Sequence, residues 1–362
     1  MPFRIAVLPF VFALLFWSAF HPVNAGPLGW VCLIPLLVYA RRTSGVRSFL
    51  LAWAGGAAAF TACFWWVRHT VLPGPPLLGI YNGLYVALFV LIIRRLGAAW
   101  AGAVWPALEF VRGHLFSGLP WFNLGYTQER AFHLIQIADL GGVWLVSALV
   151  AFVNGALVDG RRAVRWPAAA AVAAAWIYGM VRVPMIEETP GPRIAVVQPN
   201  IPQDLKLLTQ ERPQQAVDNF RRHVELTKEA AASAPDLVCW PEAAIYRGIA
   251  WDAAAQAFLR TSWYDRVLAA GQAAGAPLVI GLLVTDLEAH GERFTNSALL
   301  VDPADGVKAR FDKVHLVPFA ELIPVESVTK PIIRAVSDLR LESMRPGAGF
   351  PVWEVAGTRF GI

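Results

Sequence analysis

The chain has 362 residues, of which 56% are hydrophobic and 16% are charged, and its mean hydropathy is +0.49. This balance excludes an ordinary soluble protein and indicates that part of the chain lies in a lipid bilayer. Residues 1–182 hold 13 arginines, no lysine and four acids, a net charge of +9, whereas the remainder holds 18 basic and 22 acidic residues, a net charge of −4. The basic excess therefore comes from arginines beside apolar segments and is no argument for nucleic-acid binding.

Seven apolar segments in the first half are long enough, or nearly so, to cross the roughly 30 Å hydrocarbon core as helices. We expect transmembrane helices at residues 4–20, 27–40, 49–67, 77–93, 97–112, 134–157 and 166–182. The second and fifth are the weakest, because they are short or interrupted by prolines and by Glu109. A charge inside a span should face the interior of the bundle, and Arg112 stands at helical spacing from Glu109 as a candidate partner.

The arginines predict the orientation of these helices, since positively charged loops stay on the cytoplasmic side of a membrane. With the N-terminus inside, most of the arginines between spans fall in cytoplasmic turns, and the opposite loops hold only Arg68, Arg112 and Arg130. The first segment is followed at once by further spans, so we interpret it as an uncleaved helix and not as a signal peptide. We therefore expect a multi-pass protein of the bacterial inner membrane whose second domain is periplasmic.

From about residue 193 the pattern changes to short apolar runs between polar helices, which predicts an α/β domain over residues 193–362 after a membrane domain over residues 1–183. The stretch 183–193 contains three prolines and a glycine and is predicted to be a hinge. Strands are expected at residues 193–198, 237–240, 277–284, 297–302 and 350–355, and helices at residues 210–232 and 251–274.

Three charged residues of the second domain are candidates for chemistry. Glu242 follows a short apolar run and a proline, so it should emerge at the carboxyl end of a strand, where partial desolvation suits a carboxylate to general-base work. Lys313 lies among apolar neighbours, needs a carboxylate partner there, and as a cation can stabilise an acyl oxyanion. Glu321 is either a second acid in the same pocket or a loop charge. A surface glutamate and an edge lysine remain the alternatives for residues taken singly.

The three cysteines, Cys32, Cys63 and Cys239, show neither a Cys-x-x-Cys pattern nor metal-ligand spacing. They are interpreted as small buried hydrophobic residues, and no disulfide framework, metal site or cofactor is predicted. Cys239 lies in the middle of a predicted strand and is therefore expected to be buried and inert as a nucleophile.

Several motifs resemble those of a known superfamily. Three motifs of the chain resemble the nitrilase superfamily, whose sites use a glutamate, a lysine and a cysteine. They are Trp240-Pro241-Glu242, residues 312–319 with the following Glu321, and residues 294–298. More narrowly, residues 198–203, residues 118–121 and the seven spans before the second domain resemble the bacterial apolipoprotein N-acyltransferase family. The resemblance covers essentially the whole chain, and it implies a polytopic helical membrane domain followed by an incomplete nitrilase-like α-β-β-α sandwich.

This resemblance implies a reaction and roles for its residues. A fatty acyl chain would pass from a phospholipid, through a thioester on the enzyme, to the N-terminal amino group of diacylglyceryl-cysteine in apolipoproteins. By motif position, Glu242 is then the general base, Lys313 the oxyanion stabiliser and Glu321 a supporting acid. Trp121, in a predicted external loop, is the residue implied to contact lipid substrate. Covalent catalysis of this kind predicts ping-pong kinetics. The resemblance implies no cofactor, no metal and no nucleic-acid partner.

The family's nucleophilic cysteine follows a Gly-x-x-x-Cys pattern after a strand, and residues 359–362 resemble the beginning of that strand. We therefore expect the nucleophile just after Ile362, in a chain truncated before it that lacks the C-terminal part of the domain and is inactive as given. Two alternatives stay open, a catalytically dead remnant of such an enzyme and a membrane-tethered amidohydrolase that passes the thioester to water.

Overall fold

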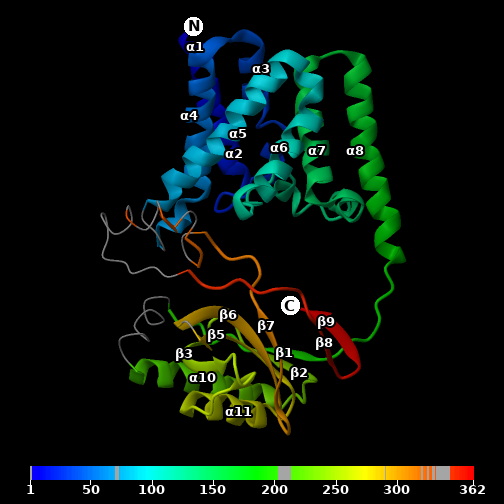
Figure 1. Cartoon of the computed structure of the whole chain (residues 1–362). Helices are drawn as coiled ribbons and strands as arrows, with labels where there is room; N and C mark the ends of the chain where they lie inside the picture. The colour runs from blue at the N-terminus through cyan, green and yellow to red at the C-terminus, as the bar shows by residue number, and fades with distance from the viewer. Residues whose placement is uncertain are drawn as a thin grey trace. The chain divides into compact units, whose positions relative to one another are not determined.

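The chain divides into two compact units, residues 1–188 and 189–362, and the boundary falls inside the stretch 183–193 that was expected to be a hinge. Figure 1 shows both units in the computed structural model. The structure describes residues 2–69, 73–202, 213–289, 291–318, 321–323, 326–327, 331 and 343–362.

The first unit is helical, as the apolar segments predicted. Its main helices are α1 (Phe3–Ala6), α2 (Leu8–Ala19), α3 (Ile34–Arg42), α4 (Gly45–Cys63), α5 (Gly74–Leu96), α6 (Ala101–His114), α7 (Ala138–Asp159) and α8 (Arg162–Arg182). Within the described residues, four helical stretches are long and apolar enough to cross a membrane: Gly45–Cys63, Gly74–Leu96, Leu134–Asp159 and Arg162–Met185. The segments at 4–20, 27–40 and 97–112 form shorter helices, so a crossing by all seven stays a prediction. The chain is a membrane protein.

Helices α4 and α5 pack closely because glycines line their contact. A Cβ added to Gly83 would lie 2.7 Å from the backbone nitrogen of Ala57, and one added to Gly56 would lie 2.7 Å from the Cβ of Val86. Small residues let two helix backbones approach in this way, which favours association in lipid. Beside this contact lies an aromatic core that includes Phe16, Phe60, Phe89 and Trp105.

Polar residues are also buried inside this unit. Glu109 and Arg112 on α6 are 4% and 2% exposed, so the expectation that Glu109 faces the interior agrees with the structure. A Glu109 oxygen accepts hydrogen bonds from the Trp105 indole (2.7 Å) and from the backbone N–H of Leu124 (2.6 Å). Arg112 donates to the side chain of Asn123 (2.7 Å). The two side chains separately tie the loop after Trp121 to the centre of the bundle, Glu109 through Leu124 and Arg112 through Asn123, so the expected pairing of Arg112 with Glu109 is not seen among the residues that the structure describes.

The second unit is built on a mixed sheet, which comprises seven strands in the described part of the chain. These are β1 (Ile194–Val196), β2 (Leu237–Cys239), β3 (Ile245–Asp252), β4 (Ala257–Phe258), β5 (Leu278–Glu288), β6 (Gly291–Asp302) and β7 (Gly306–Asp312). Strands β2 and β3 both run parallel to β5, so they follow one another along the same side of that strand. On its other side β5 pairs antiparallel with β6, which pairs antiparallel with β7.

Alternating side chains give this sheet two apolar faces. One face, with Val238, Ile280 and Leu299, packs in a single core with residues of α10 (Pro213–Ala231) and α11 (Ser262–Ala274), which cover it in Figure 1. The other face, with Leu237 and Leu300, packs against the hairpin of β8 (Val352–Val355) and β9 (Thr358–Gly361). The expected fold class, a helical membrane domain followed by a layered nitrilase-like α/β domain, is confirmed.

One predicted helix is wrong in its first half. Residues 251–274 form a helix only over Ser262–Ala274, whereas Trp251 and Phe258 pair across an antiparallel hairpin of β3 and β4. The alanines of this stretch favour a helix, but the carboxylate of Asp252 accepts hydrogen bonds from the N–H groups of Ala254 and Ala255 and closes a turn instead. The helix expected at 210–232 is α10, and its first residues, 210–212, lie outside the described part of the chain.

Candidate active site

Glu242 stands where the chain passes from β2 to β3 along the edge of β5. Strand β2 ends at Cys239, the N–H of Trp240 bonds to the carbonyl of Val279, and the N–H of Ala244 bonds to the carbonyl of Gly281. The indole of Trp240 also donates to the hydroxyl of Thr227 on α10 (2.8 Å). These contacts fix the chain on both sides of Glu242 and confirm that it emerges at the carboxyl end of a strand.

Gly281 makes this arrangement possible. A Cβ added there would lie 2.6 Å from the carbonyl oxygen of Pro241 and 2.7 Å from the Cα of Glu242. Real Cβ atoms do not approach backbone atoms so closely, so any side chain at position 281 must push the segment that carries Glu242 off the sheet.

Gly281→Ala is therefore expected to lower the free energy of unfolding by about 1–3 kcal/mol, the usual range for overpacking, and to displace Glu242. The measurements are denaturant unfolding of the purified second unit and the acyl-transfer rate of the full-length protein. Gly349→Ala is the matched control, because a Cβ at position 349 meets no atom within 4 Å. Equal effects of the two substitutions would contradict this explanation.

Lys313 lies directly after β7, where the register of the sheet brings it to Glu242. Its backbone N–H bonds to the carbonyl of Asn296 on β6 (2.8 Å), and its carbonyl accepts from the N–H of Gly347 (3.0 Å). The ammonium Nζ lies 3.0 Å from Oε1 of Glu242, and 3.1 and 3.0 Å from the two oxygens of Glu321. The three residues singled out from the sequence therefore form one cluster.

Glu321 is the most firmly held member of that cluster. Its side chain is 11% exposed, against 29% for Lys313 and 62% for Glu242. Besides the contacts to Lys313, its Oε2 accepts the backbone N–H of Val317 (2.9 Å), and its own N–H returns to the carbonyl of Val317 (2.8 Å). A buried carboxylate bound in this way is suited to hold the lysine in place and is poorly suited to exchange protons.

Glu242 differs from the sequence-based expectation in one respect. It was expected to be partly desolvated beside apolar side chains, and instead its side chain is 62% exposed. Its Oε1 lies 3.0 Å from the Lys313 ammonium, so an ion pair holds the carboxylate while it stays open to solvent. The accessible carboxylate of the cluster is thus the one suited to take a proton from a substrate group.

Asn296 is a site residue that the sequence analysis did not identify. Its side-chain Nδ2 donates to Oε1 of Glu242 (2.5 Å) and to Oε1 of Glu321 (2.7 Å), so one amide joins both carboxylates. It is 6% exposed on β6, where the buried part of the strand begins at Thr295. The run Thr-Asn-Ser at 295–297 was noted only as part of a family motif, although three consecutive polar residues in a buried strand are themselves a signal.

A second polar network lies beneath the end of β7. Arg310 bonds through two nitrogens to Asp286 (2.8 and 3.0 Å) and through Nε to Asp312 (2.7 Å), the residue before Lys313. The hydroxyl of Ser297 donates to the same Asp312 oxygen (2.6 Å). Burial lowers the pKa of Arg310, but the hydrogen bonds to Asp286 and Asp312 outweigh burial and hold the pKa above the ordinary arginine value. The guanidinium therefore stays charged and joins β5, β6 and β7 next to the site.

The pKa of Lys313 follows the same balance. Burial lowers it, but the hydrogen bonds to Glu242 and Glu321 outweigh burial and hold the pKa above the ordinary lysine value of 10.5. Because the folded-state pKa is raised, the stabilising contribution of this contact is fully present below pH 10.5 and is lost as the pH rises through the higher value.

Acetylation should reveal this protonation. At pH 8.5 we expect an N-hydroxysuccinimide acetate to modify Lys313 more slowly than the exposed Lys228, because the two carboxylates raise the pKa of Lys313 and leave less of it as free amine. Peptide mass spectrometry gives both rates in one sample. Removing the two carboxylates in a Glu242→Gln, Glu321→Gln variant should reduce the difference; equal rates in the unmodified protein would contradict the ion-pair cluster.

Two other predicted residues lie outside the cluster. Cys239 is half-buried on the face of the sheet that packs against β8 and β9, and burial raises the pKa of its thiol, which agrees with an inert residue. Trp121 belongs to the first unit, where it is 45% exposed and stacks on Trp66 with ring centroids 4.9 Å apart. Its contact with substrate stays a prediction.

Two family models match the chain. The model described as the apolipoprotein N-acyltransferase N-terminal domain matches residues 12–156, and the model described as carbon-nitrogen hydrolase matches residues 193–362. They correspond to the helical unit and to the unit that carries Glu242, Lys313 and Glu321.

Curated proteins similar to the chain bear the name apolipoprotein N-acyltransferase. The protein of Geobacter metallireducens is 29% identical over 100% of the chain and 73% of its own length. Those of Vibrio cholerae (29%) and Brucella melitensis (30%) align with 87% and 89% of the chain, which spans 64% and 65% of their lengths. On these matches to both of its units, the chain belongs to the apolipoprotein N-acyltransferase family.

Proposed function

We propose that this protein transfers a fatty acyl chain from a phospholipid, through an enzyme thioester, to the N-terminal amino group of a diacylglyceryl-cysteine on an apolipoprotein. The family assignment supports N-acyl transfer in lipoprotein maturation and membrane-bound lipid and lipoprotein substrates. The choice of phospholipid as donor and of the diacylglyceryl amine as acceptor is our proposal.

One observation carries the proposal: the Lys313 ammonium lies within 3.1 Å of both Glu242 and Glu321, which differ sharply in exposure. A fixed cation next to an accessible carboxylate supplies the two functions that acyl transfer needs, a site for negative charge and a site for a proton. Asn296 and Glu321 hold the pair in register, so the cation needs no reorganisation during the reaction.

In the first step, Glu242 takes the proton of the nucleophilic cysteine thiol that the family resemblance implies, and the sulfur attacks the ester carbonyl of the phospholipid. Lys313 stabilises the oxyanion of the tetrahedral intermediate, and Glu242 returns the proton to the departing alcohol of the lysophospholipid. In the second step, the substrate amine attacks the thioester, its proton passes to Glu242, and Glu242 gives the proton to the departing sulfur, which restores the thiol. Each step begins and ends with Glu242 ionised and Lys313 protonated.

We further propose that the second unit lies on the periplasmic side of the inner membrane. The distribution of arginines supports this orientation, since few of them fall in the predicted outer loops. Both substrates are anchored in the bilayer, so a catalytic unit tethered to the same membrane meets them at high effective concentration.

A conditional depletion strain tests the function. Expression of the full-length protein in a bacterium depleted of its own N-acyltransferase should restore a third acyl chain on lipoproteins, measured as the mass of the N-terminal lipopeptide. The Glu242→Gln variant, expressed in the same way, is the matched control and should leave diacyl lipopeptides. If the unmodified protein is present at normal levels in the membrane and the lipopeptides remain diacylated, the proposal is contradicted.

A further inference from the structure

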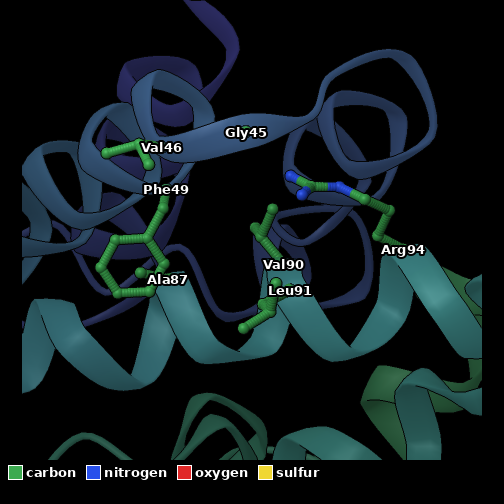
Figure 2. Close-up of a pocket in the computed structure, with 7 residues that line it drawn as sticks. All are labelled: Gly45, Val46, Phe49, Ala87, Val90, Leu91 and Arg94. Carbon is green, nitrogen blue, oxygen red and sulfur yellow. The ribbon is translucent and has the colours of Figure 1, made fainter.

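A groove opens on the surface of the helical unit between α4 and α5, as Figure 2 shows. Its volume is about 270 Å³, slightly below the usual lower limit for a drug-sized ligand, so it suits a segment of a single chain. Gly45, Val46 and Phe49 line it from the first turns of α4. Ala87, Val90, Leu91 and Arg94 line it from α5, at positions that recur on one face of a helix.

The groove lies where the glycine-mediated contact between the two helices ends. Gly56 and Gly83 hold α4 and α5 together near their middle, whereas at the beginning of α4 an added Cβ on Gly45 would meet no atom within 4 Å. Val46 is 75% exposed, so an apolar side chain stands open at this edge of the groove. A surface of this kind on a membrane helix is covered by lipid chains and not by water.

Arg94 places a cation at one end of the apolar groove. Its Nη2 donates to the hydroxyl of Ser48 (2.8 Å), but its Nε is buried and has no hydrogen-bond partner among the residues that the structure describes. A guanidinium has five N–H donors and loses hydration when it is partly buried, so this one is poorly compensated by the protein. A phosphate at its accessible edge would supply a counter-charge and acceptors for the terminal N–H groups that Ser48 does not engage.

The surroundings of Arg94 are also basic. Residues 34–50 and 84–100 contain no acid, and they hold Arg41, Arg42, Arg47, Arg94 and Arg95. Asp159, at the end of α7, is paired with Arg161 (2.7 Å). The N-terminus of α4 has no side-chain cap, so its first N–H groups add positive potential at the same end of the groove.

From this geometry we propose that the groove binds an anionic phospholipid of the cytoplasmic leaflet, with one acyl chain along Val46, Phe49 and Val90 and the headgroup phosphate at Arg94. Basic pockets between membrane helices on the cytoplasmic side recognise anionic headgroups in this way. The arginines of this end are those that predict its cytoplasmic position. Trp65 and Trp66 follow the other end of α4, about 27 Å away for a 19-residue helix, so this site is separate from the predicted substrate contact at Trp121.

Lipid retention by the purified full chain tests the proposal. The protein is reconstituted in nanodiscs of phosphatidylcholine with a minor share of phosphatidylglycerol, and the lipids that stay bound after ejection are counted by native mass spectrometry. We expect phosphatidylglycerol to be enriched, and Arg94→Gln to reduce its retention about five-fold, the effect of one arginine near a charged headgroup. Arg95→Gln is the matched control, because it removes an equal charge from the next residue, outside the groove lining.

Val46→Trp is the second variant, and it tests the apolar part of the groove. The exposed position tolerates a larger side chain without disturbing the core, and the indole should fill the groove and lower retention of phosphatidylglycerol and phosphatidylcholine alike. Equal losses for Arg94→Gln and Arg95→Gln would show diffuse charge attraction and overturn the site, as would unchanged retention in Val46→Trp. Neither readout depends on acyl transfer, so the result is independent of the proposed catalytic function.

Discussion

Lys313→Met is expected to lower the rate of acyl transfer by about 10²–10³-fold, the usual effect of removing one donor that stabilises a developing oxyanion. Methionine keeps the length of the side chain but has no charge, so it leaves Glu242 and Glu321 without the ammonium that lies within 3.1 Å of both. The measurement is the initial rate of thioester formation from labelled phospholipid by the full-length protein.

Lys308→Met is the matched control for this substitution. Lys308 lies on β7, the strand that leads to Lys313. Its ammonium pairs with the exposed Asp305, which precedes the first residue of that strand, and not with a residue of the cluster. Its replacement removes the same charge and should leave the rate within a factor of about two, since exposed ion pairs contribute little. A Lys313→Met enzyme that works as fast as Lys308→Met would exclude an oxyanion role.

Glu242→Gln is the second substitution with a large expected effect, a loss of about 10²–10⁴-fold in both thioester formation and aminolysis, as is usual for a general base. Glutamine keeps the shape of the side chain and an oxygen that can accept from Lys313 and Asn296, but it cannot take up a proton. Pre-steady-state measurement of the two half-reactions separates this role from substrate binding. If only one half-reaction slows, the single-base scheme is wrong.

Glu321→Gln provides the contrast within the site. Glu321 is the buried carboxylate that holds Lys313 through both oxygens and accepts the N–H of Val317. Its loss should lower thermal stability together with the rate, whereas Glu242→Gln, at a position with a 62% exposed side chain, should lower the rate with little change in stability.

The parts of this site that the sequence predicted depend on local patterns. A glutamate after a short apolar run and a proline must lie at the end of a strand, and a lysine among apolar residues requires a carboxylate partner. Both arguments hold for Glu242 and Lys313. That Glu321 is the second partner followed from its position in a family motif, while its low exposure and its bonds to Val317 could not be read from composition alone.

Asn296 was missed because its role depends on long-range register. The pairing of Leu283 with Asn296 and of Ser297 with Asp312 places the amide between two carboxylates that are 54 and 25 residues away in sequence. The same limit applies to strands β3 and β4, where one Asp252 turn overrides the helix propensity of three alanines. Tertiary pairing decides such positions, and periodicity within one segment does not contain it.

The exposure of Glu242 was mispredicted for a related reason. Its neighbours in sequence, Trp240 and Ile245, are buried, but they turn into the core that α10 and α11 cover, whereas the chain leaves the sheet at Glu242. The close contact with Gly281 sets this departure. The local apolar composition therefore predicted the strand correctly, but it predicted the wrong environment for Glu242, which follows the strand.

The most direct test of the account follows one labelled acyl chain through both half-reactions. The full-length protein is incubated with phospholipid carrying a radiolabelled acyl group, the acyl-enzyme is isolated, and a diacylglyceryl-cysteine peptide is added. We expect the label to move from a hydroxylamine-sensitive thioester to the N-terminus of the peptide, and both steps to fail in Glu242→Gln. Release of the label as free fatty acid, with no N-acylated peptide, would contradict the assignment.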